Sequence, residues 1–154
     1  MNYLKEAEDI IKNCGKLQDS LQNLKNRKTH LLLKTQPKEA SGIDYSKPNI
    51  QKQSYSNDTL SQLCEIAQVN EQIKETEAEI KIVKDILKQI KKENEILEKF
   101  LRIRYIENPK DNLKLISRKL GYSEDSNHTI YDIKNNALRE FAIRYFGVRA
   151  IKNT

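Results

Sequence analysis

The chain has 154 residues, of which 32% are charged and 6% aromatic, and it contains no Trp. This composition is typical of a long helical protein and argues against the packed core of a conventional enzyme. The net charge of +6 is uneven, because residues 1–100 carry 17 Lys and Arg against 16 Asp and Glu, whereas residues 101–154 carry 11 against 6. A near-neutral first part joined to a basic end indicates that the C-terminal part binds a polyanion.

The first predicted helix spans residues 3–33, where apolar residues recur at seven-residue spacing from Tyr3 to Leu31. Gly15 weakens it locally through its backbone freedom. Pro37 lacks a backbone donor and pushes the preceding residue out of helical conformation, so the helix ends before it. Residues 35–58 show no period and contain turn residues such as Gly42 and Pro48, which predicts a long connector.

The second predicted helix runs from residue 59 to about residue 106, a stretch without Pro or Gly. At 1.5 Å per residue it would be about 70 Å long. Apolar positions repeat every seven residues between Ile66 and Leu101, which favours a left-handed coiled coil with one continuous seam. The seam positions assigned to coiled-coil and dimer contacts are Ile66, Val69, Ile73, Ile80, Val83, Leu87, Ile90, Asn94 and Leu97.

Asn94 is the one strongly polar residue on this seam. It resembles the buried Asn that fixes register in dimeric coiled coils; the alternative is an exposed position near a frayed part of the coil. The seam can pair with residues 3–33 of the same chain or with a second chain. The simplest arrangement uses both, with two helical hairpins meeting in a bundle, and so predicts a homodimer. We therefore expect a helical coiled-coil region at 1–100 and a separate module at 101–154.

The last third of the chain predicts two helices joined by a glycine turn. Pro109 ends the long helix, and Asn112 or Asp111 can cap a short helix over residues 113–120. Gly121 then stands where a left-handed residue is favoured. A second helix follows over about residues 126–146. A short helix, a turn and a second amphipathic helix form the helix-turn-helix pattern, whose second helix fits the major groove of DNA.

The polar residues of this module are candidates for DNA contact. Basic side chains on the first helix are placed to meet phosphates, and polar side chains on the second helix are placed to meet bases. Asp132 shares that second face, where it accepts a hydrogen bond from cytosine or pairs with Arg139. The candidate DNA-binding residues are Lys114, Arg118, Lys119, Ser126, Asn127, His128, Thr129, Tyr131, Asn135 and Arg139.

The segment Asn112–Ser123 resembles the helix-turn-helix of sigma-factor region 4. Residues Ile116, Leu120, Gly121 and Ser123 match its Ile-Ala…Leu-Gly-Ile-Ser pattern. Farther on, the spacing of Thr129-Ile130, Ile133, Ala137-Leu138 and Phe141 is also similar. Ser117 departs from the usual Ala, Asn136 stands where Arg is common, and three extra residues lie between Ser123 and Thr129.

Most of the chain is similar to small regulators of the ArpU and RinA type, found in phages and prophages of low-GC Gram-positive bacteria. These proteins join an N-terminal helical region to a C-terminal module like sigma region 4. The segment 43–51 resembles their connectors. The resemblance implies a regulator of phage late-gene transcription that binds double-stranded DNA, with RNA polymerase as a further partner. The residues themselves carry the argument as far as a basic helix-turn-helix dimer.

Two other functions remain open from the sequence: a phage DNA-packaging or scaffold protein, and a protein that binds polymerase or a sigma-like partner without DNA. An enzyme is not expected. Two His and two Cys lack the spacing of a metal site, and the chain has no Gly-rich phosphate loop, so neither metal nor cofactor is predicted. Cys14 falls on an apolar helix face and is expected to be buried.

We expect the protein in the cytoplasm. No apolar stretch approaches the roughly 20 residues that span a bilayer, so no membrane partner is predicted. The first residues, MNYLKEAE, carry acids where a secretion signal would be basic and then apolar.

Overall fold

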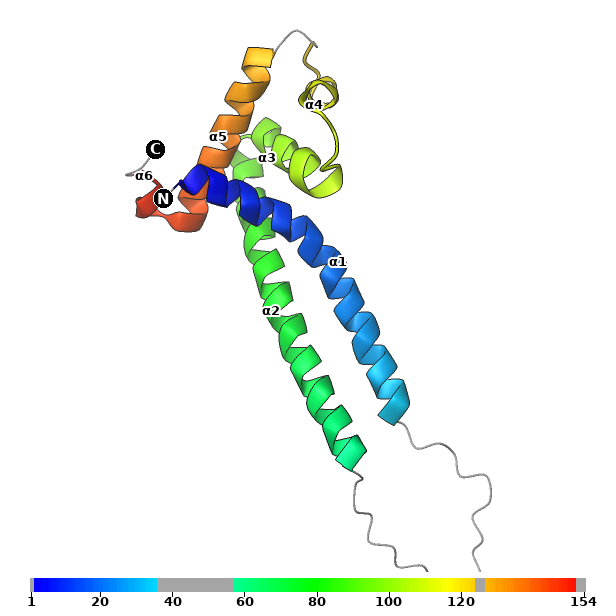
Figure 1. Ribbon diagram of the computed structural model, residues 1–154. Coiled ribbons are helices and arrows are strands. Elements are labelled where there is room, and N and C mark those ends of the chain that lie inside the picture. Colours follow the sequence, from blue (N-terminus) through cyan, green and yellow to red (C-terminus); the bar gives the residue numbers. More distant parts are fainter. Residues whose placement is uncertain (1, 36–56, 124–126, 152–154) are drawn as a thin grey trace, which may run out of the picture. The chain divides into compact units, whose positions relative to one another are not determined.

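The computed structural model describes residues 2–35, 57–123 and 127–151. The regular secondary structure in these ranges is entirely helical, which confirms the predicted all-α fold with a long hairpin followed by shorter helices (Figure 1). The elements are α1 (Tyr3–Thr35), α2 (Asn57–Glu93), α3 (Glu95–Leu101), the π-helical segment η1 (Arg102–Glu107), α4 (Leu113–Lys119), α5 (Asn127–Phe146) and α6 (Val148–Ile151). The predicted connector lies almost wholly outside the described residues. No described helix is long and apolar enough to cross a membrane.

The contacts within the chain define two compact units. We call them the head, which comprises Met1–Asp19 and Glu77–Thr154, and the arm, which comprises Ser20–Thr76. The predicted division near residue 100 is therefore not where the contacts divide. The first half of α1 and the last part of α2 belong with the short C-terminal helices, because their side chains supply part of the same core.

The arm is an antiparallel pair formed by the end of α1 and the start of α2. Its core is a single apolar cluster in which Leu31 packs with Ile66, Val69 and Ile73, and Leu21 and Leu24 lie against it. The guanidinium of Arg27 also bonds the carboxylate of Glu65 across the pair. In the arm, the heptad seam of α2 is thus buried against α1 of the same chain.

The same seam is buried in the head. Ile80, Val83, Leu87 and Ile90 are all less than 7% exposed in a single chain. Sequence reasoning left open whether the seam pairs within or between chains, and the structure pairs it within the chain up to Ile90. The predicted homodimer stays a prediction. The seam residues of α2 from Ile66 to Ile90 are buried within the chain, so they offer no exposed surface on which it could form.

The prediction of one unbroken helix over residues 59–106 is wrong, and so is the assignment of Asn94 to a coiled-coil seam. The helix ends at Glu93, and Asn94 adopts an extended conformation with φ −149° and ψ 100°. Its side-chain oxygen accepts hydrogen bonds from the backbone N–H groups of Ile96 and Leu97, at 3.1 and 3.3 Å. Asn94 is an exposed N-cap that starts α3, because its short amide competes with the helical backbone.

Because the helix is interrupted at Asn94, the last residues of the heptad pattern pack in a different place from the rest. Leu97 is half-buried and Leu101 fully buried, but both belong to α3, which packs against α5. Phe100 and Phe141 are completely buried in this part of the head. The residues after Leu101 form the π-helical turn η1, closed by a bond from the Asn108 N–H to the Ile103 carbonyl at 3.1 Å. Such turns are rare and occur mostly as single turns within α-helices, and a heptad count does not reveal them.

Helix α5 is held at several points along its length. Near its middle, the ammonium of Lys134 lies 3.6 Å from the Glu8 carboxylate on α1. Near its end, the rings of Phe146 and Tyr3 are 5.1 Å apart between centroids. Arg144, only 16% exposed, bonds Glu93 at the last position of α2. The first turns of α1 and the end of α2 therefore fix α5 within the head.

Candidate nucleic-acid interface

Helix α4 has well-defined ends that agree with the sequence prediction. The side chain of Asn112 accepts a hydrogen bond from the Leu115 N–H at 2.9 Å and caps the start of the helix. At the other end, Gly121 has φ +86°, the left-handed conformation that glycine adopts at lowest cost. The Gly121 and Tyr122 N–H groups bond the carbonyls of Arg118 and Ser117, both at 3.0 Å. This Schellman pattern fixes the direction in which the chain leaves α4.

Ser117, in the second half of α4, has a defined role. It is 3% exposed, and a buried hydroxyl without a partner would destabilise the fold. Its Oγ donates to the carbonyl of Ser123 at 3.2 Å, on the far side of the glycine turn. The hydroxyl therefore ties the turn back onto α4.

Helix α5 has one buried and one exposed face. The buried face comprises Ile130, Ile133, Ala137, Leu138 and Phe141, each at most 8% exposed. The opposite face carries side chains at positions i, i+3, i+4, i+7 and i+11, which fall on one stripe of a helix. All five are exposed: His128, Tyr131, Asp132, Asn135 and Arg139. We call this the α5 stripe; at 1.5 Å per residue it is about 16 Å long.

The structure brings most of the candidate residues of α5 together on this stripe. His128, Tyr131, Asn135 and Arg139 belong to it, and the exposed Thr129 lies on its flank. Tyr131 is 53% exposed, so it is available for contact and is not part of the core. Ser126 and the side chain of Asn127 lie outside the described residues.

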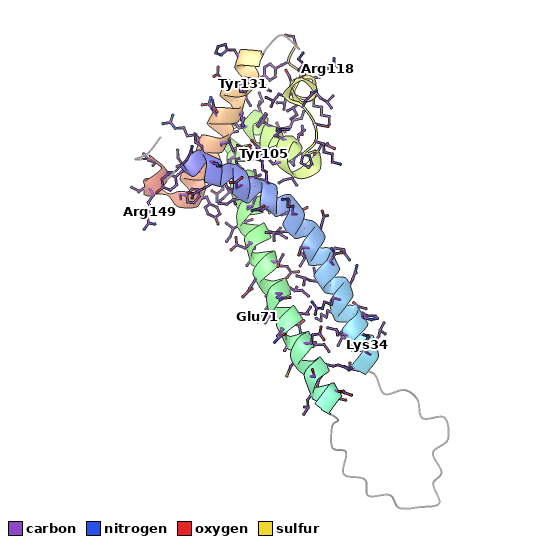
Figure 2. The ribbon with its side chains drawn as sticks, viewed as in Figure 1. Lys34, Glu71, Tyr105, Arg118, Tyr131 and Arg149 are labelled. Atoms are coloured by element: carbon purple, nitrogen blue, oxygen red, sulfur yellow. The ribbon has the colours of Figure 1, made fainter. Side chains whose placement is uncertain are left out.

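The three basic candidates of α4 are exposed but not equivalent. The Lys119 ammonium is 2.6 Å from the Asp111 carboxylate, so part of its charge is already neutralised. Arg118 also has an interaction partner. Lys114 forms no ion pair within the described part of the chain, and it is therefore the α4 cation best placed to meet a phosphate. Figure 2 shows Arg118 on α4 and Tyr131 on α5 at the same end of the head, where these two helices pack together.

Two residues near this surface were not among the sequence candidates. Lys110 is exposed in the loop that leads into α4, and its position just before the Asn112 cap was the available signal. Leu115 is 37% exposed on α4, although its spacing suggested no contact role. Lys134, by contrast, lies on α5 but is bonded to Glu8, so it serves the packing of the head.

Three titratable side chains of the head, Glu8, Tyr105 and Cys14, have pKa values shifted by their surroundings. Burial alone would raise the pKa of Glu8, but a hydrogen bond from Lys12 and the charge of Lys134 together lower it below its ordinary value. Burial, together with the nearby Glu8 charge, raises the pKa of Tyr105. Burial also raises the pKa of Cys14, which is fully buried as predicted. Tyr105 therefore stays neutral while Glu8 stays charged toward Lys134.

The described residues contain no group of three or more His, Cys, Asp and Glu side chains placed to hold a metal ion. Comparison with protein-family models, curated proteins and solved structures finds no match for the chain.

Proposed function

We propose that the protein is a sequence-specific DNA-binding transcription regulator that reads double-stranded DNA with α5. The observation that carries the proposal is the α5 stripe, an exposed polar face beside basic α4 on the part of the chain with most of the net positive charge. An α-helix fits the major groove, and Asn and Arg are the side chains that make paired hydrogen bonds to adenine and guanine there. The resemblance to ArpU and RinA proteins supports a role in phage late-gene regulation.

In this proposal, α5 contacts base edges and α4 contacts the phosphate backbone. Asn135 and Arg139 are one turn apart and would read adjacent base pairs. Asp132 lies between His128 and Asn135 on the same face, and phosphate would repel its carboxylate. It therefore favours a docking in which the stripe meets base edges and Lys114 on α4 meets the backbone. Base contacts specify the site, whereas phosphate contacts give affinity that does not depend on sequence.

The test begins with selection of bound sequences from a random duplex library by the full chain. On the selected site, Asn135→Ala and Arg139→Ala should each relax selectivity at one base pair, at a cost of about 1–3 kcal/mol. Lys114→Ala should weaken binding to all sequences alike and lower the salt dependence by about one phosphate contact. The matched control is Lys81→Ala, an exposed Lys on α2 that belongs to neither α4 nor the α5 stripe, which should leave binding unchanged.

Other outcomes would point to the other functions. If no sequence is selected and the chain instead retains RNA polymerase, the protein acts without DNA contact and the proposal is wrong. If DNA binds but Asn135→Ala and Lys81→Ala behave alike, α5 is not the reading helix. A ring-shaped assembly that selects a single site at the start of packaging would indicate a packaging protein.

A further inference from the structure

The end of the arm carries four exposed leucines. Leu32 and Leu33 lie in the last turn of α1, and Leu60 and Leu63 lie in the first two turns of α2, with 43%, 61%, 51% and 47% of their surface exposed. Single exposed leucines are common, but a group of four marks an interaction surface. Leu60, Leu63 and the exposed Ala67 follow i, i+3, i+7 spacing, so they form a second apolar stripe on a side of α2 that α1 does not cover.

The two helices of the arm have opposite charge. Residues 20–35 of α1 contain four basic residues and no acid: Lys25, Arg27, Lys28 and Lys34. Residues 57–76 of α2 contain four acids and one base: Asp58, Glu65, Glu71, Glu75 and Lys74. Within the described residues, Arg27 and Glu65 pair inside the hairpin, whereas the exposed Glu71 and Glu75 form no ion pair. One arm therefore presents both a basic helix and an acidic helix.

We propose that a second copy of this chain covers the arm, with the two hairpins related by a two-fold axis parallel to the helices. Such an axis places α1 of one copy against α2 of the other in antiparallel orientation. The bond between Arg27 and Glu65 sets the level of the two helices. Along the helix axis, this bond places Leu32 beside Leu60 and Lys25 beside Ala67, about one helical turn from Glu71. Leucine then meets leucine, and a basic helix meets an acidic one.

A second copy fits this surface because each arm carries both halves of the complementary pair. A two-fold axis forms every contact twice, which is the commonest arrangement of soluble dimers. The product is a four-helix bundle in which the heptad seam stays within each chain and the exposed stripes form the contact between chains. The inference goes beyond the proposed DNA binding, because it concerns the arm and holds with or without a DNA partner.

The first experiment measures the association of the full chain by sedimentation without DNA. A dimer is expected at micromolar concentration, and Leu63→Lys should weaken it about tenfold or more, which corresponds to about 1.4 kcal/mol. The matched control is Ile82→Lys, also on α2 and 44% exposed but in the head, which should leave the dimer intact. A wild-type chain that sediments as a monomer at 100-fold higher concentration, or equal effects of the two variants, would overturn the proposal.

The second experiment separates contacts between chains from contacts within a chain. Lys25→Glu with Lys28→Glu removes the net positive charge of residues 20–35 in α1, and Glu71→Lys with Glu75→Lys makes residues 57–76 of α2 net basic. Each double variant should dimerise poorly by itself, because α1 of one copy and α2 of the other then no longer carry opposite net charge. Mixing the two should restore a mixed dimer, since each variant supplies the charge that the other needs. Circular dichroism verifies that both variants remain helical.

Restoration by mixing is possible only if the charges act between chains. If both variants are folded and monomeric and the mixture stays monomeric, the charges act inside the hairpin and the proposal is wrong. A third variant replaces residues 36–56 with a Gly-Ser segment of equal length, and it should dimerise as the wild type does. If the dimer forms only in this variant, the replaced segment covers the leucines in the wild type, which also overturns the proposal.

Discussion

The arm and the head show two different ways of burying the same heptad pattern. In the arm, α1 and α2 meet along a regular seam, and residues such as Ile66 and Leu31 pack at the positions that the seven-residue repeat predicts. In the head, the repeat continues to Ile90 and then stops at Asn94, where the chain turns and builds a core from short helices. A regular repeat thus organises the hairpin of the arm, whereas within the head a single capping residue, Asn94, separates α2 from the short helices that follow.

The largest expected difference concerns the two cores. Phe141→Ala removes a ring that is completely buried in the head and should lower the free energy of unfolding by about 3–5 kcal/mol. Ile66→Val, in the arm, should cost about 0.5–1.5 kcal/mol, because it removes one methylene group. Urea denaturation gives both values, and DNA binding gives the functional readout. If Phe141→Ala costs no more than Ile66→Val, the head does not have the tight core described for it.

The next effect tests whether Asn94 belongs to the seam or to a cap. Asn94→Ile should destabilise the protein by about 1–2 kcal/mol, because isoleucine cannot accept the bonds from Ile96 and Leu97. Asn94→Asp should be nearly neutral, because aspartate caps helices equally well. If Asn94 lay on a buried seam instead, the isoleucine variant would be the more stable of the two. Thermal unfolding of the three proteins decides between the roles.

The turn between α4 and α5 should show an effect of similar or smaller size. Gly121→Ala forces a side chain into the left-handed conformation and should cost about 1–2 kcal/mol. Beyond Gly121 and its two chain neighbours, no heavy atom of the described residues lies within 4 Å of the added Cβ, so the cost comes from the backbone and not from a collision. The matched control is Gly15→Ala, at a helical position whose nearest neighbour is the Tyr105 carbonyl at 3.4 Å. Equal unfolding midpoints for the two variants would contradict this account of the turn.

The smallest effect concerns the ion pair between α1 and α5. The pKa of Glu8 is lowered in the folded protein, so its contribution to stability is present above its unfolded pKa and is lost as the pH falls through the folded value. That contribution should be below about 1 kcal/mol, since the pair is partly exposed. Glu8→Gln should therefore lower stability at pH 7 but not at pH 3. A constant difference at both pH values would show that the charge of Glu8 is not responsible.

Sequence reasoning located most of the candidate interface because that surface depends on local chemistry. The cap at Asn112, the left-handed Gly121 and the exposed positions of His128 and Arg139 all follow from residue type and spacing along a single helix. Sequence reasoning did not reveal that Lys119 is paired with Asp111, since that contact joins a loop to the end of a helix. It also did not predict η1, because a π-helical turn leaves no repeat to count.

The sequence by itself determined the helical class, the apolar faces of α1, α2 and α5, and the basic character of the C-terminal third. These follow from periodicity and charge, which are properties of short stretches of chain. Only the tertiary structure decided that the seam of α2 pairs with α1 and that Asn94 caps a new helix. A seven-residue repeat specifies that a face will be buried, but it does not specify which helix will bury it. That choice depends on contacts between residues far apart in the chain, such as Leu31 with Ile66 in the arm.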